Sequence, residues 1–194
     1  MQREVAVISG PTGSGETTIT NEVIARYPKS VARLVTATTR PPRDEEKDGK
    51  DYYFFSKEDF IQATLDGRIP EYTYTKNRDT YYGSFLPDLE KKLGNGLVVL
   101  VNADIVGARY YKERFSAVTI FVVPENLTAL ERRIRERSPS LSEKEIAHRK
   151  ENAAAEIEKE KSFYDHVVVN ADGKLDKAVD EIVEILSKEG YTLR

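Results

Sequence analysis

The sequence has no cysteine and no tryptophan among its 194 residues, and only one methionine. The absence of cysteine excludes disulfide bonds, thiol catalysis and thiolate metal sites, and it is typical of a reducing compartment. No apolar run is long enough to cross a membrane, and the sequence starts without a signal-peptide pattern. We therefore expect a cytoplasmic protein that has no membrane partner.

The sequence also lacks an excess of positive charge. The 30 Lys and Arg residues face 33 Asp and Glu residues, so the formal net charge is −3. This balance does not favour a nucleic-acid partner, and any anion site must come from local arginine clusters and backbone N–H groups. With 39% hydrophobic and 32% charged residues, the composition predicts one folded domain over residues 1–194.

Short apolar runs alternate with segments of helical periodicity along most of the chain. The runs predict buried strands at 4–9, 97–101, 118–123 and 166–170. The periodic segments predict helices at 17–27, 104–114, 126–137, 142–161 and 175–188. Alternation of this kind favours an α/β fold in which helices cover both faces of a parallel sheet.

Residues 35–94 differ in composition from the rest. They are rich in Tyr, Thr, Arg and turn residues, and they include the alternating segments DYYFF (51–55) and EYTYT (71–75). This pattern predicts a small, mostly antiparallel insert that carries a substrate site. Residues 132–161 are strongly charged, which is typical of a solvated helix pair or of a mobile lid. The core would then consist of residues 1–34, 95–131 and 162–194.

The segment GPTGSGETTIT (10–20) lies between the first predicted strand and the first predicted helix. Gly10, Gly13 and Gly15 let the backbone turn its N–H groups towards a phosphate, and the helix N-terminus adds partial positive charge. Thr17 would place its hydroxyl on a magnesium ion. An ordinary glycine-rich turn is the simpler alternative, but strand, glycine spacing, threonine and helix agree on a phosphate-binding loop. Its candidate ATP-binding residues are Pro11, Thr12, Gly13, Ser14, Gly15, Glu16, Thr17 and Thr18.

Glu16 stands where this loop pattern has a lysine that reaches the outer phosphates. Two unit charges about 4 Å apart interact by roughly 4 kcal/mol at an effective dielectric near 20, so the acid replaces an attraction by a similar repulsion. If the loop serves phosphoryl transfer, we expect weak binding of the nucleotide phosphates and turnover reduced on the scale of a lost arginine finger, about 10³–10⁵-fold. Glu16 could instead turn to solvent or cap local N–H groups.

A second phosphate-binding pattern lies in TTRPPR (38–43). The guanidinium groups of Arg40 and Arg43 fit phosphate oxygens in a bidentate manner, and the prolines between them stiffen the segment. Tyr52 and Tyr82 could donate phenol hydrogen bonds to the same phosphate. Each tyrosine alone is more often a core or surface side chain, but the four residues together predict an anion pocket.

Several motifs resemble, in order and spacing, those of the guanylate kinase family. They are GPTGSGETT, TATTRPPR, DGKDYYF, IPEY, YYGS, NADIVGA and YDHVVVN, and they extend over about residues 5–185. The combination of TTRPPR, DGKDYYF and YYGS is the specific part, because many NTPases share the loop alone. The resemblance implies a P-loop NTPase core of three layers, a GMP-binding insert and a helical lid. It also implies transfer of the γ-phosphoryl group of ATP to GMP with Mg²⁺, by a monomer or homodimer.

The resemblance further assigns residues to the GMP site. Arg40, Arg43, Tyr52 and Tyr82 match the residues that hold the GMP phosphate. Glu71 matches a carboxylate that accepts hydrogen bonds from the guanine N1–H and exocyclic amine, and adenine lacks this pair of donors. The remaining members of the set are the hydroxyl groups of Thr36 and Ser84, which contact guanine, and Asp104, which supports the base. The position of Asp104 also suits a helix N-cap.

On the ATP side, Arg133 and Arg137 match arginines that reach the ATP phosphates, and Arg149 matches one that clamps the transferring group. Asn170 matches a residue near the adenine. Arg40, Arg43, Arg137 and Arg149 are thus the catalytic candidates, although the lid arginines alone would be interpreted as solvated helix charge. Besides Glu16, the sequence departs from the family at Asn102, where many members have an acid, and at Thr36, where serine is usual.

Three functions remain open from the sequence. The first is a guanylate kinase whose chemistry is slowed or compensated. The second is a catalytically weak or inactive GMP-binding or protein-interaction module, and the third is a kinase for another phosphorylated small molecule. The lid arginines argue against the second, because an interaction module needs no ATP clamp. Glu71 and the two hydroxyl groups argue against the third.

Overall fold

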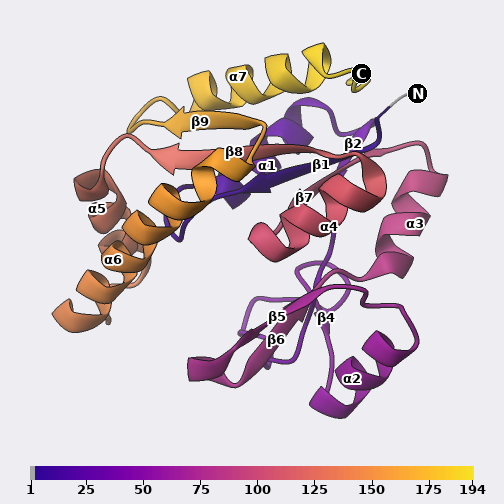
Figure 1. Cartoon of the computed structure of the whole chain (residues 1–194), viewed down its shortest axis with the longest axis horizontal. Coiled ribbons are helices and arrows are strands. Elements are labelled where there is room, and N and C mark those ends of the chain that lie inside the picture. The colour runs from indigo at the N-terminus through magenta and orange to yellow at the C-terminus, as the bar shows by residue number, and fades with distance from the viewer. Residues whose placement is uncertain (1–2) are drawn as a thin grey trace.

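A five-stranded parallel sheet forms the centre of the molecule (Figure 1). The computed structural model describes residues 3–194, without the side chain of Asn77. The strand order is β2-β7-β1-β8-β9. These strands are β1 Val5–Ser9, β2 Val31–Arg33, β7 Val98–Asn102, β8 Val118–Pro124 and β9 His166–Asn170. The predicted parallel sheet is confirmed, and all four predicted strands lie within it.

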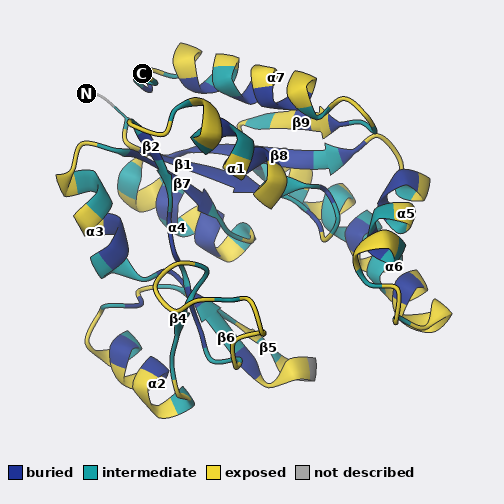
Figure 2. Cartoon of the chain, turned by 180° about the vertical axis from the view of Figure 1, so that it is seen from behind, coloured by how far each residue is buried: buried dark blue, intermediate teal, exposed yellow. Residues whose placement is uncertain are grey.

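Helices cover both faces of this sheet. On one face, α1 (Glu16–Arg26) and α7 (Leu175–Lys188) contribute Ile19, Val23 and Ile182 to a core cluster. On the other, α3 (Leu86–Gly94) and α4 (Ile105–Phe115) pack Leu89 and Tyr111 against the strands. The central strands β7, β1 and β8 and the inner helix faces are buried, whereas the edge strand β9 is partly exposed and the outer helix faces are exposed (Figure 2). Because burial of each large aliphatic side chain contributes about 1.5–3 kcal/mol, this three-layer core is the main source of stability.

The insert contains a second sheet with the order β4-β3-β6-β5. Its strands are β3 Ala37–Thr38, β4 Tyr53–Phe54, β5 Tyr72–Thr75 and β6 Thr80–Gly83, and a 3₁₀ turn, η1 (Lys76–Arg78), joins the last two. β6 pairs antiparallel with both β3 and β5, as predicted, whereas β3 and β4 are parallel. A helix that was not predicted, α2 (Lys57–Leu65), places Phe60 in the small core of the insert.

Two further helices, α5 (Leu127–Arg137) and α6 (Glu143–Glu160), pack on each other beside the sheet. Leu130, Ile134 and Ile146 form their shared apolar core, and η2 (Lys161–Phe163) leads back to β9. Both helices begin at capping side chains: Asn126 accepts from two backbone N–H groups, and Ser142 forms a capping box with Glu145. Within residues 3–194, no helix is long and apolar enough to span a membrane.

A buried carboxylate joins the insert to the core. Asp88 of α3 is only 5% exposed, and it accepts hydrogen bonds from Val35 N at 2.9 Å and Tyr53 Oη at 3.2 Å. It also forms an ion pair with Lys92, whose Nζ donates to Arg33 O at 2.7 Å. These contacts connect α3, the chain after β2 and strand β4, so they fix the base of the insert on the core.

We predict that Asp88→Ala lowers the free energy of unfolding by about 3 kcal/mol, because it leaves the Lys92 ammonium and the Val35 N–H without their partner. Urea denaturation measures this change as a lower midpoint. Glu90→Ala is the matched control, since Glu90 is exposed on the same helix. Equal midpoints for the two variants would contradict a structural role of Asp88.

Candidate active site

The phosphate loop and Asp104 meet at the carboxyl ends of the strands, because β1 and β7 are adjacent and parallel. Ile8 lies opposite Asn102, so the loop after β1 and the residues after β7 emerge side by side. Gly13 and Gly15 both have φ of 93°, a left-handed conformation that favours glycine. A Cβ on Gly10 would lie 2.3 Å from Val122 O, so only glycine fits there. The predicted loop geometry therefore depends on these three glycines.

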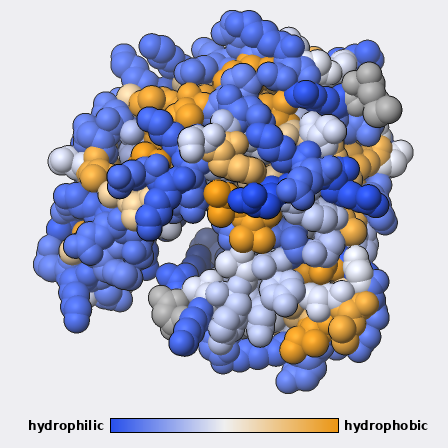
Figure 3. All heavy atoms as spheres, in the orientation of Figure 1, coloured by the Kyte–Doolittle hydropathy of each residue, from blue (hydrophilic) through white to orange (hydrophobic). Residues whose placement is uncertain are grey.

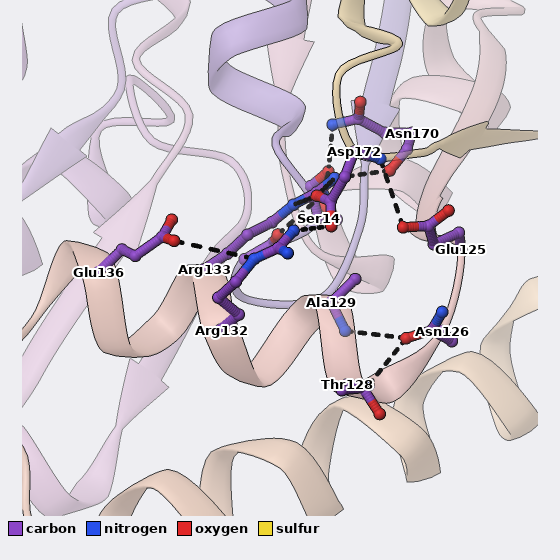
Figure 4. A network of polar contacts seen from close by, with 11 residues as sticks. Ser14, Glu125, Asn126, Thr128, Ala129, Arg132, Arg133, Glu136, Asn170 and Asp172 are labelled. Carbon is purple, nitrogen blue, oxygen red and sulfur yellow. Dashed lines mark hydrogen bonds and ion pairs between the residues drawn. The ribbon is translucent and has the colours of Figure 1, made fainter.

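Arg133 and Asn170 hold the loop from behind (Figure 4). The Asn170 amide donates to Ser14 O at 2.8 Å, and the Arg133 guanidinium donates to Ser14 O at 3.3 Å, Asn170 O at 2.8 Å and Asp172 Oδ1 at 2.8 Å. A Cβ on Gly15 would lie 2.4 Å from Asn170 Nδ2. Both residues are candidate ATP ligands. In the structure the Asn170 amide donates to the loop, and the Arg133 guanidinium donates to the loop, to Asn170 and to Asp172.

A large cavity of about 740 Å³ lies between the loop, the insert and the α5–α6 pair. Figure 3 shows the molecule hollowed between the helix pair and the insert, with hydrophilic residues around the hollow. Six arginines line this phosphate cavity: Arg40, Arg43, Arg78, Arg133, Arg137 and Arg149. The loop contributes Thr12, Gly13, Gly15, Glu16, Thr17 and Thr18, whereas Pro11 and Ser14 are buried beneath it. The structure therefore brings the predicted catalytic arginines and most of the loop residues together.

Arg40 is held by a carboxylate that the sequence analysis missed. Glu46 accepts from two guanidinium nitrogens of Arg40, both at 2.6 Å, and from Arg43 N at 2.9 Å. The Arg40 guanidinium also lies 5.0 Å from the ring centroid of Tyr52. Hydrogen bonding by Arg40 lowers the pKa of Glu46 to about 2. Glu46 thus orients Arg40, and both side chains line the cavity.

A smaller pocket of about 250 Å³ adjoins the phosphate cavity. Tyr52 and Tyr82 line both spaces, with their ring centroids 6.1 Å apart, so the two cavities are adjacent. The other predicted residues of the GMP site that line this base pocket are Thr36, Glu71, Ser84 and Asp104. Thr73 and Thr75 of β5 also line it and were not predicted.

Two carboxylates face the base pocket, one from the insert and one from the core. Glu71 accepts a hydrogen bond from Ser84 Oγ, and burial raises the pKa of its carboxyl group above the ordinary value. Asp104 caps α4, accepting from Val106 N at 3.0 Å and Gly107 N at 3.2 Å, so the predicted N-cap is confirmed. Its second oxygen accepts from Thr73 Oγ1 at 2.6 Å, which ties β5 of the insert to the core.

Glu16 is half-buried at the start of α1, and two other acidic residues lie around the same pocket. A pocket of about 280 Å³ contains Glu16 together with Asp104 and Glu156. Burial and the charge of Glu156 raise the pKa of Glu16 to about 8, although Arg137 acts in the opposite direction. At neutral pH the Glu16 carboxyl is therefore largely protonated. The loop therefore lacks the attraction of a lysine for the phosphates, but a protonated Glu16 does not repel them as a carboxylate would.

We predict that Glu16→Gln raises the melting temperature progressively as the pH increases from about 4.5 to 8. The native carboxyl titrates near 8 and an unperturbed one near 4.5, so in this window the native state binds more protons than the unfolded state. The unfolding free energy of the parent protein therefore falls with pH, and glutamine removes that loss. A change of 1 kcal/mol corresponds to about 2–4 °C for a chain of this size.

Thermal unfolding monitored by circular dichroism at several pH values tests this expectation. Glu151→Gln serves as the control, because Glu151 is an exposed acid of α6. A pH-independent difference between parent and Glu16→Gln would contradict the burial of the Glu16 carboxyl.

The glycine loop at the edge of a parallel sheet, the helix pair beside it and the arginine-lined cavity define the class of P-loop nucleotide kinases. Within this class, a model of the family described as guanylate kinase matches residues 2–189, and the chain belongs to the guanylate kinase family.

Individual relatives agree with this assignment. The chain is 37% identical over 185 residues to a guanylate kinase of Wolbachia sp. subsp. Brugia malayi, covering 94% of this chain and 91% of that protein. It is 36% identical over 192 residues to a guanylate kinase of Geobacter metallireducens, covering 97% and 91%. The crystal structure of guanylate kinase from Anaplasma phagocytophilum superposes with a TM-score of 0.74 at 28% identity, covering 98% of this chain and 88% of that one.

Proposed function

We propose that the protein transfers the γ-phosphoryl group of ATP to GMP, giving ADP and GDP. The observation that supports this reaction best is that the base pocket and the phosphate cavity adjoin and share Tyr52 and Tyr82 in their linings. A nucleoside monophosphate that occupies both would have its base near Glu71 and its phosphate among the arginines.

Guanine is the base that suits the smaller pocket. It offers an adjacent N1–H and exocyclic amine to the carboxylate of Glu71, while the hydroxyl groups of Thr36 and Ser84 line the same space. Adenine has no such donor pair, so it would leave the buried carboxylate with only the Ser84 hydroxyl as a donor, which is costly.

The phosphates of the two nucleotides would meet in the larger cavity. We assign Arg40, Arg43, Tyr52 and Tyr82 to the phosphate of GMP. The ATP phosphates would lie on the N–H groups of the loop, with Arg137 and Arg149 at the transferring group. Arg133 and Asn170 then act by holding the loop that binds ATP, because both bond to Ser14 O.

Two polar residues near the phosphate loop, Thr17 and Asn102, fit a magnesium ion. The exposed Thr17 hydroxyl lines the phosphate cavity, and Mg²⁺ prefers oxygen ligands that it shares with water and substrate phosphates. Asn102, which lines a pocket together with Glu16, has a buried Oδ1 with no hydrogen-bond partner in the described part of the chain. Thr17 would hold the ion, and Mg²⁺, when bound, neutralises charge on the phosphates.

The mechanism needs no covalent intermediate. An oxygen of the GMP phosphate attacks the γ-phosphorus of ATP in line with the leaving ADP oxygen, so one P–O bond forms as another breaks. The arginines position the two nucleotides and stabilise the charge on the transferring oxygens. Approach of the α5–α6 pair to the insert would exclude water and so prevent hydrolysis of ATP.

A GMP-binding module with little catalysis is the second candidate, and Glu16 is the observation that favours it. The loop has no side-chain cation at this position, so ATP binding relies on backbone N–H groups and on arginines from other elements. The same fold would then retain the GMP site while turnover is low.

We predict that the parent protein releases ADP slowly from ATP and GMP, and that Glu16→Lys is faster by about 10–10³-fold because it restores an attractive charge at the phosphates. A coupled assay of ADP release measures both rates. Glu22→Lys is the matched control, as it makes the same charge change elsewhere on α1. Equal rates for parent and Glu16→Lys would refute the impairment by Glu16, and inactivity of both would favour the binding module.

We further predict that Glu71→Gln weakens GMP binding by about 10–100-fold and ATP binding by less than about twofold. The amide keeps the size of the side chain but loses the charged acceptor for two guanine donors, an interaction worth about 1.5–3 kcal/mol. Titration calorimetry with each nucleotide separates the two effects, and Glu58→Gln on α2 is the control. Equal losses for GMP and ATP would remove Glu71 from the guanine site.

A further inference from the structure

Arg78 faces the phosphate cavity from an element that the guanylate kinase motifs do not include. It ends η1, the turn between β5 and β6, and it lines the same 740 Å³ cavity as Glu16 and Thr17. It does not line the base pocket that contains Glu71. Its position therefore relates it to the phosphates of the proposed reaction, on which this inference rests, rather than to the base.

The backbone around Arg78 is fixed by several contacts. Thr80 Oγ1 donates to Arg78 O at 2.8 Å. The next residue, Asp79, has a left-handed φ of 49°, forms an ion pair with Lys57 of α2 and accepts from Tyr74 Oη at 2.8 Å. These contacts join the turn to both strands and to α2, so the turn moves with the insert and not independently of it.

The guanidinium of Arg78 is available for a ligand. Arg40 is paired with Glu46 and Arg133 with Asp172, but among the described side chains no carboxylate lies within 4.0 Å of Arg78. Glu16 lines the same cavity, where the loop has a carboxyl group in place of a cation. Arg78 is thus a cation of the insert that lines the same cavity as a loop without a cation at position 16.

We propose that Arg78 binds the phosphate groups between the two nucleotides and supplies there the positive charge that the loop lacks at position 16. A guanidinium fork matches two phosphate oxygens, whereas a lysine acts as a point charge. Because Arg78 belongs to the insert, its charge reaches the ATP phosphates when the insert approaches the loop. GMP alone, bound through its base and by Arg40 and Arg43, does not need it.

A solvated charge at the tip of a turn is the simpler interpretation of Arg78, and the same turn contains a control for it. Lys76 is also exposed and cationic, but it does not line the phosphate cavity. Lys76→Ala therefore removes the same charge from the same turn without removing a cavity residue.

The test compares the parent, Arg78→Ala, Arg78→Lys and Lys76→Ala by steady-state kinetics and by calorimetry. The calorimetric probes are GMP and a bisubstrate in which five phosphates link adenosine to guanosine. We expect Arg78→Ala to lower kcat and the bisubstrate affinity by about 10–100-fold and GMP affinity by less than about twofold. Arg78→Lys should recover part of the loss, and Lys76→Ala should match the parent.

A second comparison repeats Arg78→Ala in the Glu16→Lys background. If Arg78 compensates for the missing loop cation, its removal costs less there, by about tenfold, than in the parent. An undiminished loss would overturn the compensation and leave the phosphate contact standing.

The remaining outcomes separate this inference from the proposed function. Identical behaviour of Arg78→Ala and Lys76→Ala, in a parent that binds both probes and phosphorylates GMP, would overturn the role of Arg78 alone. A parent that binds neither GMP nor the bisubstrate would overturn the proposed function and the role of Arg78 with it.

Discussion

The hydrogen bonds that Arg133 and Asn170 make to Ser14 O hold the loop on which the phosphate site is built. They reach it from α5 and β9, elements more than a hundred residues further along the chain. These contacts and the left-handed glycines fix the shape of the loop, which has no lysine to bind phosphate. A preformed loop of backbone donors is the part of the site that tolerates Glu16, because its N–H groups do not depend on that side chain.

The balance of charge in the cavity follows from where each group is placed. Six arginines line it from two parts of the fold, the insert and the α5–α6 pair. Burial raises the pKa of Glu16 to about 8 and that of Glu156 to about 7, which reduces the negative charge behind the loop near neutral pH. Phosphoryl transfer of this type depends mainly on positioning and charge neutralisation. Arginines from the insert and the helix pair can therefore neutralise phosphate charge that the side chains of the loop leave uncompensated.

The sequence predicted the long, locally determined elements well and the short ones poorly. β9 and α7 have the predicted bounds, because apolar periodicity and turn residues define them locally. β2, β3 and β4 are only two or three residues long, and pairing with distant strands creates them. α2 had a local signal that was overlooked, since Ser56 caps the helix and accepts from Asp59 N. In the site, Glu46, Thr73, Arg78 and Glu156 were not predicted, because only the fold places them in the cavities.

The central claim is that the base pocket selects guanine and delivers its phosphate to ATP across the arginine-lined cavity. The most direct measurement is the transfer of labelled phosphoryl from γ-labelled ATP to GMP, AMP, CMP and UMP, each supplied separately with Mg²⁺. We expect labelled GDP to form at least about 10²-fold faster than any other diphosphate, because the other bases leave the carboxylate of Glu71 without its two donors. Comparable transfer to AMP, or no transfer to any acceptor, would contradict this account.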